Sequence, residues 1–393
     1  MKFNHFFIPQ GAKVVHDELQ NLFTINYNEG TYEDPKPTVL KLPADSTVVL
    51  DTGNALKPGI IDHHQPGCEF ADKCVAHIVV NHGATYLEHL KQKEEVNIIT
   101  HFIPDLDALG AVYFTMKYLM NKSFTFLDFQ LADYINMVDM GKLSLDPEKP
   151  VGIASLWLHY TAIKDYNQAY TQEFNKALLN QGLLFMEGVI NVIERDENPY
   201  TNEGFEAIEA FKEPIQHILD DALNYANDME NSITGIIELY NKDTRGLDEV
   251  EVVISRDAKS FLWKYFVRGD QNNTLFGKGF KLTCLHNSSK KGAIISVDPN
   301  FPYDLKGLGV YLDSLEVTNL LKNQGVKEII NGQDGGPRSG FHRNNPWYDG
   351  RGTHNFTIID VPRGGTSLTE KQINEAIYAY HLWNEYATFC NIN

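Results

Sequence analysis

The chain has 393 residues, 42% of them hydrophobic, and a formal net charge of −18 at pH 7. A chain of this length buries large cores and is expected to divide into two domains. The excess of acidic residues argues against a protein that grips long nucleic acid, because such binding depends on a basic surface and on counterion release.

Signals for cross-linking or export are weak. The chain has four cysteines, Cys68, Cys74, Cys284 and Cys390. Their spacing contains no C-x-x-C pair, so it indicates neither a zinc ribbon nor a disulfide framework. No apolar stretch approaches the length needed to cross a membrane, and the amino terminus lacks the pattern of a signal peptide. We therefore expect a cytoplasmic protein that does not bind membranes.

The first polar cluster follows a strand predicted at residues 46–50. This apolar, β-branched run ends at Asp51, and the pair Thr52-Gly53 then breaks the strand. A second apolar pair leads directly into Asp62-His63-His64. Carboxylate oxygens mixed with imidazole nitrogens suit Mn²⁺, Fe²⁺ or Zn²⁺ better than Ca²⁺ or Cu⁺.

The second polar cluster follows a strand predicted at residues 96–100, which ends at His101. A loop with Asp105 and Asp107 comes next, and residues 108–120 have helical periodicity. Because the two aspartates are two residues apart, an extended loop would point both carboxylates the same way.

Strand, acidic loop and helix in this order are the units of a parallel α/β sheet. Ligands bind such sheets beyond the carboxyl ends of the strands. One edge of the sheet is therefore expected to carry Asp51, His63, His101, Asp105 and Asp107. Converging carboxylates repel one another, and a bound pair of cations removes that cost. We predict a two-metal hydrolase site.

In these residues the chain resembles the DHH phosphoesterase superfamily, named for its Asp-His-His signature. His101 to Gly110 match the family motif His-x-x-Pro-Asp-x-Asp-Ala-x-Gly at every specified position, and Asp62 to His64 match the signature itself. Asp51 corresponds to a lone aspartate at a strand end, and Asp139 is the candidate for a fourth motif. The order of the two main motifs is exchanged relative to the family, since the signature comes first here.

The resemblance implies a division of labour. One metal ion would be held by His101 and Asp105, the other by Asp107, His63 and Asp139, with Asp51 bridging the two. Asp62 would orient an imidazole, and His64 would face the scissile phosphate or its leaving oxygen. Two ions that share a hydroxide nucleophile neutralise charge on phosphorus without a covalent intermediate. The implied ions are two Mn²⁺, with Mg²⁺, Co²⁺ or Fe²⁺ as alternatives.

Plainer interpretations stay open for single residues. Asp139 precedes Gly141 at a predicted helix end, where an aspartate is equally typical of a capping or solvated residue. His77, His82 and His89 lie on a helical stretch after the signature and are expected to be packing or surface histidines.

Domain organisation follows from changes of pattern along the chain. The first domain is predicted at residues 1–230, with a parallel sheet that carries the metal motifs and a helix-rich extension from about residue 150. A smaller mixed α/β domain for substrate binding is predicted at residues 231–393. Its predicted strands are 233–240, 250–255, 261–267, 280–285, 293–297 and 356–360, and its predicted helices are 308–322 and 369–389.

A segment rich in Gly and Arg, residues 331–363, is the predicted substrate contact. Its candidate residues are Gly335, Gly336, Arg338, His342, Arg343 and Arg351. Paired glycines let backbone N–H groups approach an anion, and arginine forks match phosphate oxygens. Many DHH phosphodiesterases carry a similar Gly-Gly-Gly-His loop in a second domain. The alternative is a turn-rich loop whose aromatic residues pack on the domain.

Together, the residues and the resemblance imply a metal-dependent phosphoesterase, a hydrolase. The expected substrate is a small nucleotide-like phosphodiester, such as a short oligonucleotide or a cyclic or linear dinucleotide, because residues 260–266 and Trp347-Tyr348 offer aromatic side chains for a base. Two alternatives stay open: a manganese pyrophosphatase or exopolyphosphatase, and a non-catalytic nucleotide-binding sensor. The complete ligand set argues against the sensor. Homodimerisation also stays open.

Overall fold

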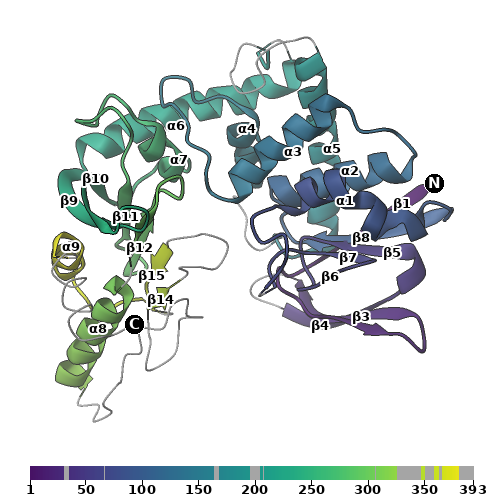
Figure 1. Cartoon of the computed structure of the whole chain (residues 1–393), viewed down its shortest axis with the longest axis horizontal. Helices are drawn as coiled ribbons and strands as arrows, with labels where there is room; N and C mark the ends of the chain where they lie inside the picture. Colours follow the sequence, from purple (N-terminus) through teal and green to yellow (C-terminus); the bar gives the residue numbers. More distant parts are fainter. Residues whose placement is uncertain are drawn as a thin grey trace. The chain divides into compact units, whose positions relative to one another are not determined.

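The computed structural model describes residues 1–30, 35–65, 67–162, 168–194, 204–206, 208–305, 307–324, 347–349, 358–362 and 365–379. The chain forms two compact units (Figure 1). The first comprises Met1–Met140 and Val151–Ile218, and the second comprises Gly141–Pro150 and Leu219–Asn393. Both mix helices with sheet, and in the described ranges no helix is long and apolar enough to cross a membrane.

A five-stranded sheet in the order β1-β8-β5-β7-β6 forms the centre of the first unit. Its strands are β1 (Lys2–Ile8), β8 (Glu95–His101), β5 (Thr47–Leu50), β7 (Ile60–Ile61) and β6 (Leu56–Lys57). The first four run parallel, and β6 is antiparallel to β7. The strands predicted at residues 46–50 and 96–100 are confirmed. Both are almost completely buried, as parallel strands covered on both faces should be.

Two different layers cover the faces of this sheet (Figure 1). The helical layer contains α1 (Val75–Leu87), α2 (Leu106–Leu119) and α3 (Phe126–Asp139). The opposite layer is an antiparallel meander of β2 (Val14–Asp17), β3 (Leu22–Gly30) and β4 (Pro35–Pro43). Phe23 and Ile25 of the meander are buried in one core with Val49 and Ile99 of the sheet. The sequence pattern did not predict this meander.

The helix-rich character predicted for residues 150–230 is confirmed. The helices are α4 (Ile153–Thr161), α5 (Gln172–Glu194) and α6 (Lys212–Glu230). Short 3₁₀ turns occur at Ala44–Ser46, Glu88–Leu90 and Glu209–Phe211. Helix α6 begins in the first unit, and from Leu219 onward it belongs to the second.

A mixed seven-stranded sheet in the order β13-β9-β10-β11-β12-β15-β14 forms the second unit. The strands are β13 (Tyr303–Asp304), β9 (Ile233–Asn241), β10 (Gly246–Arg256), β11 (Leu282–Asn287), β12 (Gly292–Val297), β15 (Ile358–Asp360) and β14 (Tyr348–Asp349). β10 and β11 are parallel, and the other pairs are antiparallel. Helices α8 (Leu308–Gln324) and α9 (Glu370–Tyr378) contribute to its core.

One predicted element is wrong, and several of the aromatic side chains predicted to contact a base are buried. Residues 261–267 were expected to form a strand, but Trp263–Gly269 form helix α7. A short apolar run fits either structure, and here the helix buries Trp263 and Phe266. Trp347 is also fully buried, and its indole N–H donates to Glu316 Oε2 at 3.2 Å. These three aromatic rings pack in the core and are not available to stack on a base, whereas Phe261 is exposed and Tyr348 is half-buried.

Candidate metal centre

The carboxyl ends of three neighbouring strands bring the predicted ligands together. Asp51 directly follows β5, Asp62-His63-His64 follow β7, and His101 ends β8. Because β8, β5 and β7 are adjacent and parallel, these residues reach the same edge of the sheet. The exchanged order of the two motifs therefore does not separate them in space, since neighbours in the sheet need not be neighbours in sequence.

Two helices supply the remaining carboxylates. Asp105 is the N-cap of α2, where its side chain accepts the Ala108 N–H at 3.0 Å, and Asp139 is the last residue of α3. Asp107 lies in the first turn of α2, so the prediction that it shares an extended loop with Asp105 is wrong.

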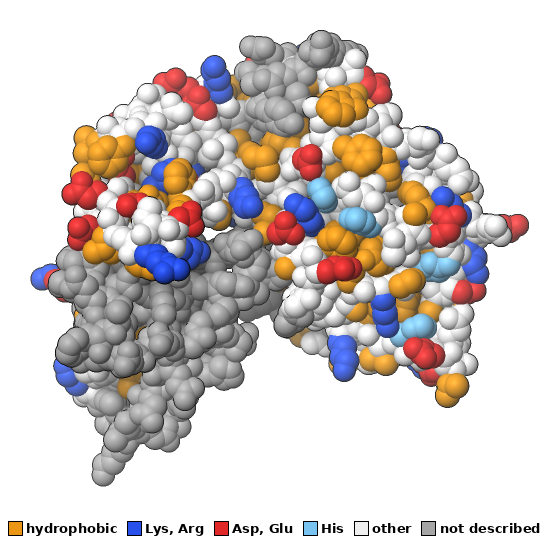
Figure 2. All heavy atoms as spheres, viewed as in Figure 1, with side chains coloured by type: hydrophobic (Ala, Val, Ile, Leu, Met, Phe, Trp, Pro, Cys, Tyr) orange, Lys and Arg blue, Asp and Glu red, His pale blue; other side chains and the backbone are white. Residues whose placement is uncertain are grey.

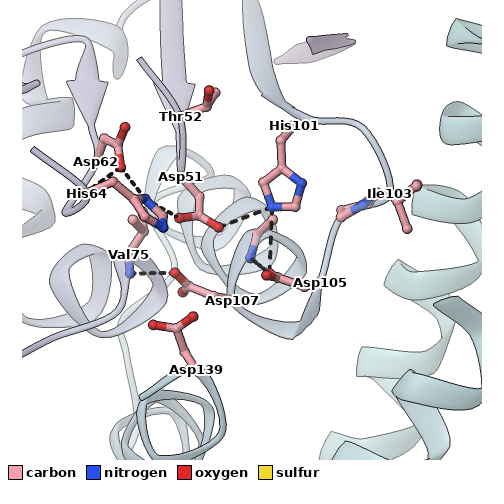
Figure 3. A network of polar contacts seen from close by, with 12 residues as sticks. Asp51, Thr52, Asp62, His64, Val75, His101, Ile103, Asp105, Asp107 and Asp139 are labelled. Atoms are coloured by element: carbon pink, nitrogen blue, oxygen red, sulfur yellow. Dashed lines mark hydrogen bonds and ion pairs between the residues drawn. The ribbon is translucent and has the colours of Figure 1, made fainter. Parts of the chain in front are cut away.

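Asp107 also binds the amino end of helix α1. Its Oδ2 accepts the Val75 N–H at 2.8 Å and its Oδ1 accepts the Ala76 N–H at 2.7 Å (Figure 3). These N–H groups have no partner inside the helix, and the positive end of the helix dipole favours a carboxylate there. Asp107 therefore links α1 to the site.

The side chains form three groups that share members, and within each group the ligand atoms lie within 4.8 Å of one another. The groups are Asp51–His101–Asp105, His63–Asp107–Asp139 and Asp51–His63–His64. The two oxygens of Asp51 face different histidines: Oδ2 lies 3.2 Å from His101 Nε2, and Oδ1 lies 3.6 Å from His63 Nε2. All six predicted metal ligands are brought together, with Asp51 in the middle, as Figure 3 shows for those that it labels.

Asp62 lies beside these groups and holds His64. Its Oδ1 is 2.7 Å from His64 Nδ1, and its Oδ2 accepts the backbone N–H of Asn54 at 2.6 Å. His64 is the more open of the two signature histidines, with 29% of its side chain exposed against 2% for His63. Asp62 thus fixes the orientation of the imidazole that is better placed to meet a substrate.

Burial makes the central carboxylates hard to ionise. It is the largest cause that raises the pKa of Asp51, to about 6, and the charge of Asp105 adds to it, while a hydrogen bond with His101 opposes it. Burial followed by the charges of Asp51 and Asp105 holds the pKa of Asp107 well above its ordinary value. Burial also holds the pKa of Asp139 well above its ordinary value, and among the neighbouring charges that of Asp107 raises it most. A bound cation would remove this cost.

For His64 and His101, the neighbouring carboxylates affect the pKa more than burial does. Burial lowers the pKa of His64, but the hydrogen bond with Asp62 and the charge of Asp51 outweigh it, and the pKa rises to about 9. For His101, burial is likewise outweighed by hydrogen bonds with Asp105 and Asp51, so its pKa lies well above the ordinary value.

The donor set fits a pair of divalent cations. Four aspartates and two or three histidines provide hard oxygen and borderline nitrogen ligands, the mixture that suits Mn²⁺ and its neighbours, and all of them except the exposed Asp105 are buried or partly buried. Within the described part of the chain, no hydrogen bond reaches Asp51 Oδ1, although this atom is buried. An ion held by these side chains would give this buried oxygen a partner.

Strained backbone marks the same place. Asp51 has φ +57° and Asn54 has φ +53°, in the left-handed region that disfavours residues with a side chain. Aspartate and asparagine tolerate this region better than most residues, and strain of this kind clusters at functional sites. The turn after β5 is therefore built to present Asp51 to the site.

The sequence did not reveal the asparagines whose hydrogen bonds hold the backbone near the ligands. Asn136 of α3 accepts the backbone N–H of Cys74, the N-cap of α1, at 2.6 Å. It lies three residues before Asp139 on the same helix, and this spacing is the signal that could have found it. Asn175 of α5, which contacts the motif loop, carries no such signal.

The predicted substrate-binding residues lie outside the described residues. They are Gly335, Gly336, Arg338, His342, Arg343 and Arg351. On the face drawn in Figure 2, the described Lys and Arg side chains are interspersed with Asp and Glu side chains. This mixed distribution differs from the continuous basic track that binds long nucleic acid.

Comparison of the chain with protein-family models, with curated proteins and with solved structures found no match.

Proposed function

We propose that this chain is a metal-dependent phosphoesterase of the DHH type that hydrolyses a small phosphorylated substrate. One observation carries the proposal: Asp51 lies between two groups of ligand atoms, Asp51–His101–Asp105 and His63–Asp107–Asp139, with one carboxylate oxygen 3.2 Å from His101 Nε2 and the other 3.6 Å from His63 Nε2. Paired sites of this kind act on phosphoryl groups by an in-line displacement between two ions.

The side chains divide between the two proposed ions by their geometry. One set is Asp51, His101 and Asp105, and the other is His63, Asp107 and Asp139, with Asp51 in reach of both. Mn²⁺ is the proposed ion, and Mg²⁺, Co²⁺ or Fe²⁺ are alternatives with the same ligand preference. Such a pair supplies Lewis-acid chemistry, since it polarises a phosphoryl oxygen and makes water a stronger nucleophile at neutral pH.

His64 supplies the proton in this proposal. With a pKa of about 9, the imidazole is protonated at neutral pH, and Asp62 holds it through Nδ1. The protonated ring donates to the leaving oxygen as the ester bond breaks. The pair Asp62–His64 is therefore the proposed general acid and its positioning partner.

The proposed substrate is a small nucleotide-like phosphodiester, with pyrophosphate or polyphosphate as the second candidate. The burial of Trp263, Phe266 and Trp347 reduces the aromatic side chains that favoured a base-bearing substrate, although Phe261 is exposed and Tyr348 is half-buried. This observation supports the inorganic alternative, because the metal edge itself needs only a phosphoryl group.

The proposal is tested by Mn²⁺-dependent product release from a linear dinucleotide, a cyclic dinucleotide, pyrophosphate and polyphosphate. The matched inactive variant is Asp51→Asn, because asparagine keeps the volume and tolerates the left-handed backbone of residue 51. Asp107→Asn is a poorer choice, since Asp107 also holds the amino end of α1. We expect turnover in the wild type and a loss of at least about 100-fold in Asp51→Asn.

The outcomes separate the candidates. Mononucleotide product supports the phosphodiesterase, whereas orthophosphate from pyrophosphate or polyphosphate alone supports the second candidate. A silent panel with Mn²⁺ bound, as measured by calorimetry, contradicts the enzyme and favours the nucleotide-binding sensor.

A further inference from the structure

The loop between His101 and Asp105 contains a backbone outlier. Ile103 has φ +55°, in the left-handed region. For a β-branched residue this conformation is a genuine outlier and persists only where the surroundings impose it. Ile103 lies two residues after one proposed ligand and two residues before another.

Asn175 of α5 holds this strained residue. Its side chain is completely buried, and its Oδ1 accepts the backbone N–H of Ile103. Its Nδ2 donates to Ala169 O and Thr171 O, each at 2.8 Å. The carboxamide thus bridges the motif loop to the turn that precedes α5, and it uses both its donor and its acceptor.

A second side chain holds the next residue of the loop. The indole N–H of Trp157 in α4 donates to Pro104 O at 3.2 Å, and Trp157 is buried. The loop is therefore held on successive residues from α4 and α5, before Asp105 begins helix α2.

We propose that Asn175 is a positioning residue for the ligands His101 and Asp105, which it places by clamping Ile103 in the left-handed conformation. The inference rests on the proposed function, because it assumes that these two side chains bind a metal ion. Both lie near Asp51, with His101 Nε2 at 3.2 Å from Asp51 Oδ2 and 3.7 Å from Asp105 Oδ1. A rotation of the peptide at Ile103 would change the distance between the two ligands.

Asn175 also has a plainer role, since its two donated bonds close the turn before α5. That role alone would affect folding and leave metal binding unchanged. Substitutions at Ile103 separate the two roles. Glycine adopts a left-handed φ without a Cβ penalty and needs no clamp, whereas alanine retains the Cβ and the penalty.

The experiment uses four variants of the full chain: Asn175→Ala, Ile103→Gly, and Asn175→Ala combined with Ile103→Gly or with Ile103→Ala. Calorimetry measures the dissociation constants for Mn²⁺, and urea unfolding in EDTA measures stability without metal. We expect Asn175→Ala to weaken Mn²⁺ binding about 10- to 100-fold, the usual effect of losing a support behind a ligand. Ile103→Gly alone should stay within about threefold of the wild type, because only the left-handed conformation is required.

The double variants decide the question. Ile103→Gly should restore most of the affinity lost in Asn175→Ala, whereas Ile103→Ala should restore none. Equal affinity in Asn175→Ala and the wild type, or no difference between the two double variants, overturns the clamp. If the wild type binds no Mn²⁺, the proposed function fails first and this inference fails with it.

Should Asn175→Ala not fold, hydrogen exchange on the wild type provides the test. The buried bond to Asn175 Oδ1 should protect the Ile103 amide as strongly as the Phe102 amide, which donates to Ile8 O at 2.8 Å in the sheet. Exchange of the Ile103 amide at the rate of an open loop contradicts the clamp.

Discussion

Asp139 is a residue where the proposed metal binding and the stability of the metal-free fold oppose each other. Burial, and then the charges of Asp107 and Asp51, hold its pKa well above the ordinary value. The folded chain therefore binds the proton of Asp139 more tightly than the unfolded chain does. This proton binding contributes its full stabilisation below the pKa of the unfolded chain, near 3.8. The contribution is lost as the pH rises through the raised pKa of the folded chain.

The variant Asp139→Asn should therefore change stability in a pH-dependent way. In EDTA, Asp139→Asn should be more stable than the wild type, because it lacks the negative charge of Asp139. The difference in the free energy of unfolding should grow from pH 4 to pH 8. With saturating Mn²⁺ the order should reverse, since the wild type gains more binding energy. Urea unfolding at both pH values measures this, and a variant that is less stable than the wild type at pH 8 in EDTA contradicts it.

The pair Asp62–His64 predicts a shift in the pH profile of activity. In the wild type, kcat/KM should fall as the pH rises through the pKa of His64, which the hydrogen bond with Asp62 holds above its ordinary value. In Asp62→Asn the carboxylate that raises this pKa is gone, so the fall should begin at lower pH, toward the ordinary value of 6.5. The variant His64→Gln is the control and should lack this limb altogether. An unchanged limb in Asp62→Asn would remove His64 from the proposed mechanism.

At the scale of elements, the motif glycine Gly110 explains how closely the helical layer packs. A Cβ on Gly110 of α2 would lie 2.6 Å from Ile135 Cδ1 of α3 and 3.1 Å from Ala76 Cβ of α1. Ile135 and Ala76 are both completely buried and have little room to move. The missing side chain of Gly110 therefore allows α1, α2 and α3 to pack closely, and α2 and α3 carry Asp107 and Asp139.

We expect Gly110→Ala to cost roughly 1–3 kcal/mol of the free energy of unfolding, as overpacking usually does. Gly83→Ala in α1 is the matched control, because its Cβ would meet Tyr118 at an ordinary 3.5 Å. There alanine should be neutral or stabilise by up to about 1 kcal/mol through its higher helix propensity. Chemical unfolding of both variants checks this, and equal effects at the two positions would contradict the packing argument.

The same elements show what the sequence could predict. The buried strands β5 and β8 and the helix after the second motif were predictable, because apolar β-branched runs and helical periodicity are local signals. The meeting of Asp51, His63, His101, Asp105 and Asp107 was predictable from strand ends, since parallel strands share an edge, whereas Asp139 was suggested only by the family resemblance. The helical position of Asp107 and the burial of Trp347 were not, because each depends on tertiary contacts such as Val75 N–H and Glu316.

At the scale of the whole molecule, the division into units is discontinuous in sequence. Residues Gly141–Pro150 belong to the second unit, where Gly141 O accepts from Arg268 Nη1 at 2.6 Å and Leu145 N–H donates to Tyr265 O at 3.1 Å. Pattern changes along a chain reveal boundaries between neighbours in sequence. A short segment that returns to a distant unit leaves no such signal.

The second half of α6 also belongs to the second unit, and its aspartates bind the loop before α7. Asp221 accepts the Phe261 N–H at 3.0 Å and the Ser260 hydroxyl at 2.8 Å, and Asp228 accepts the Lys259 N–H at 2.8 Å. A fragment that begins at residue 231 lacks these acceptors. Each buried donor left without a partner costs roughly 1–3 kcal/mol, which is a large part of the stability of a domain.

Both fragments lack residues 141–150, so the comparison isolates the second half of α6, and we therefore expect residues 219–393 to unfold at a higher temperature than residues 231–393. In the intact chain, Asp221→Ala should lower the free energy of unfolding by at least roughly 1–3 kcal/mol, the cost of one donor, because up to three donors lose their acceptor. Circular dichroism and calorimetry of the two fragments make the comparison. Cooperative unfolding of both fragments at the same temperature would show that the second half of α6 is dispensable and that the unit begins with β9.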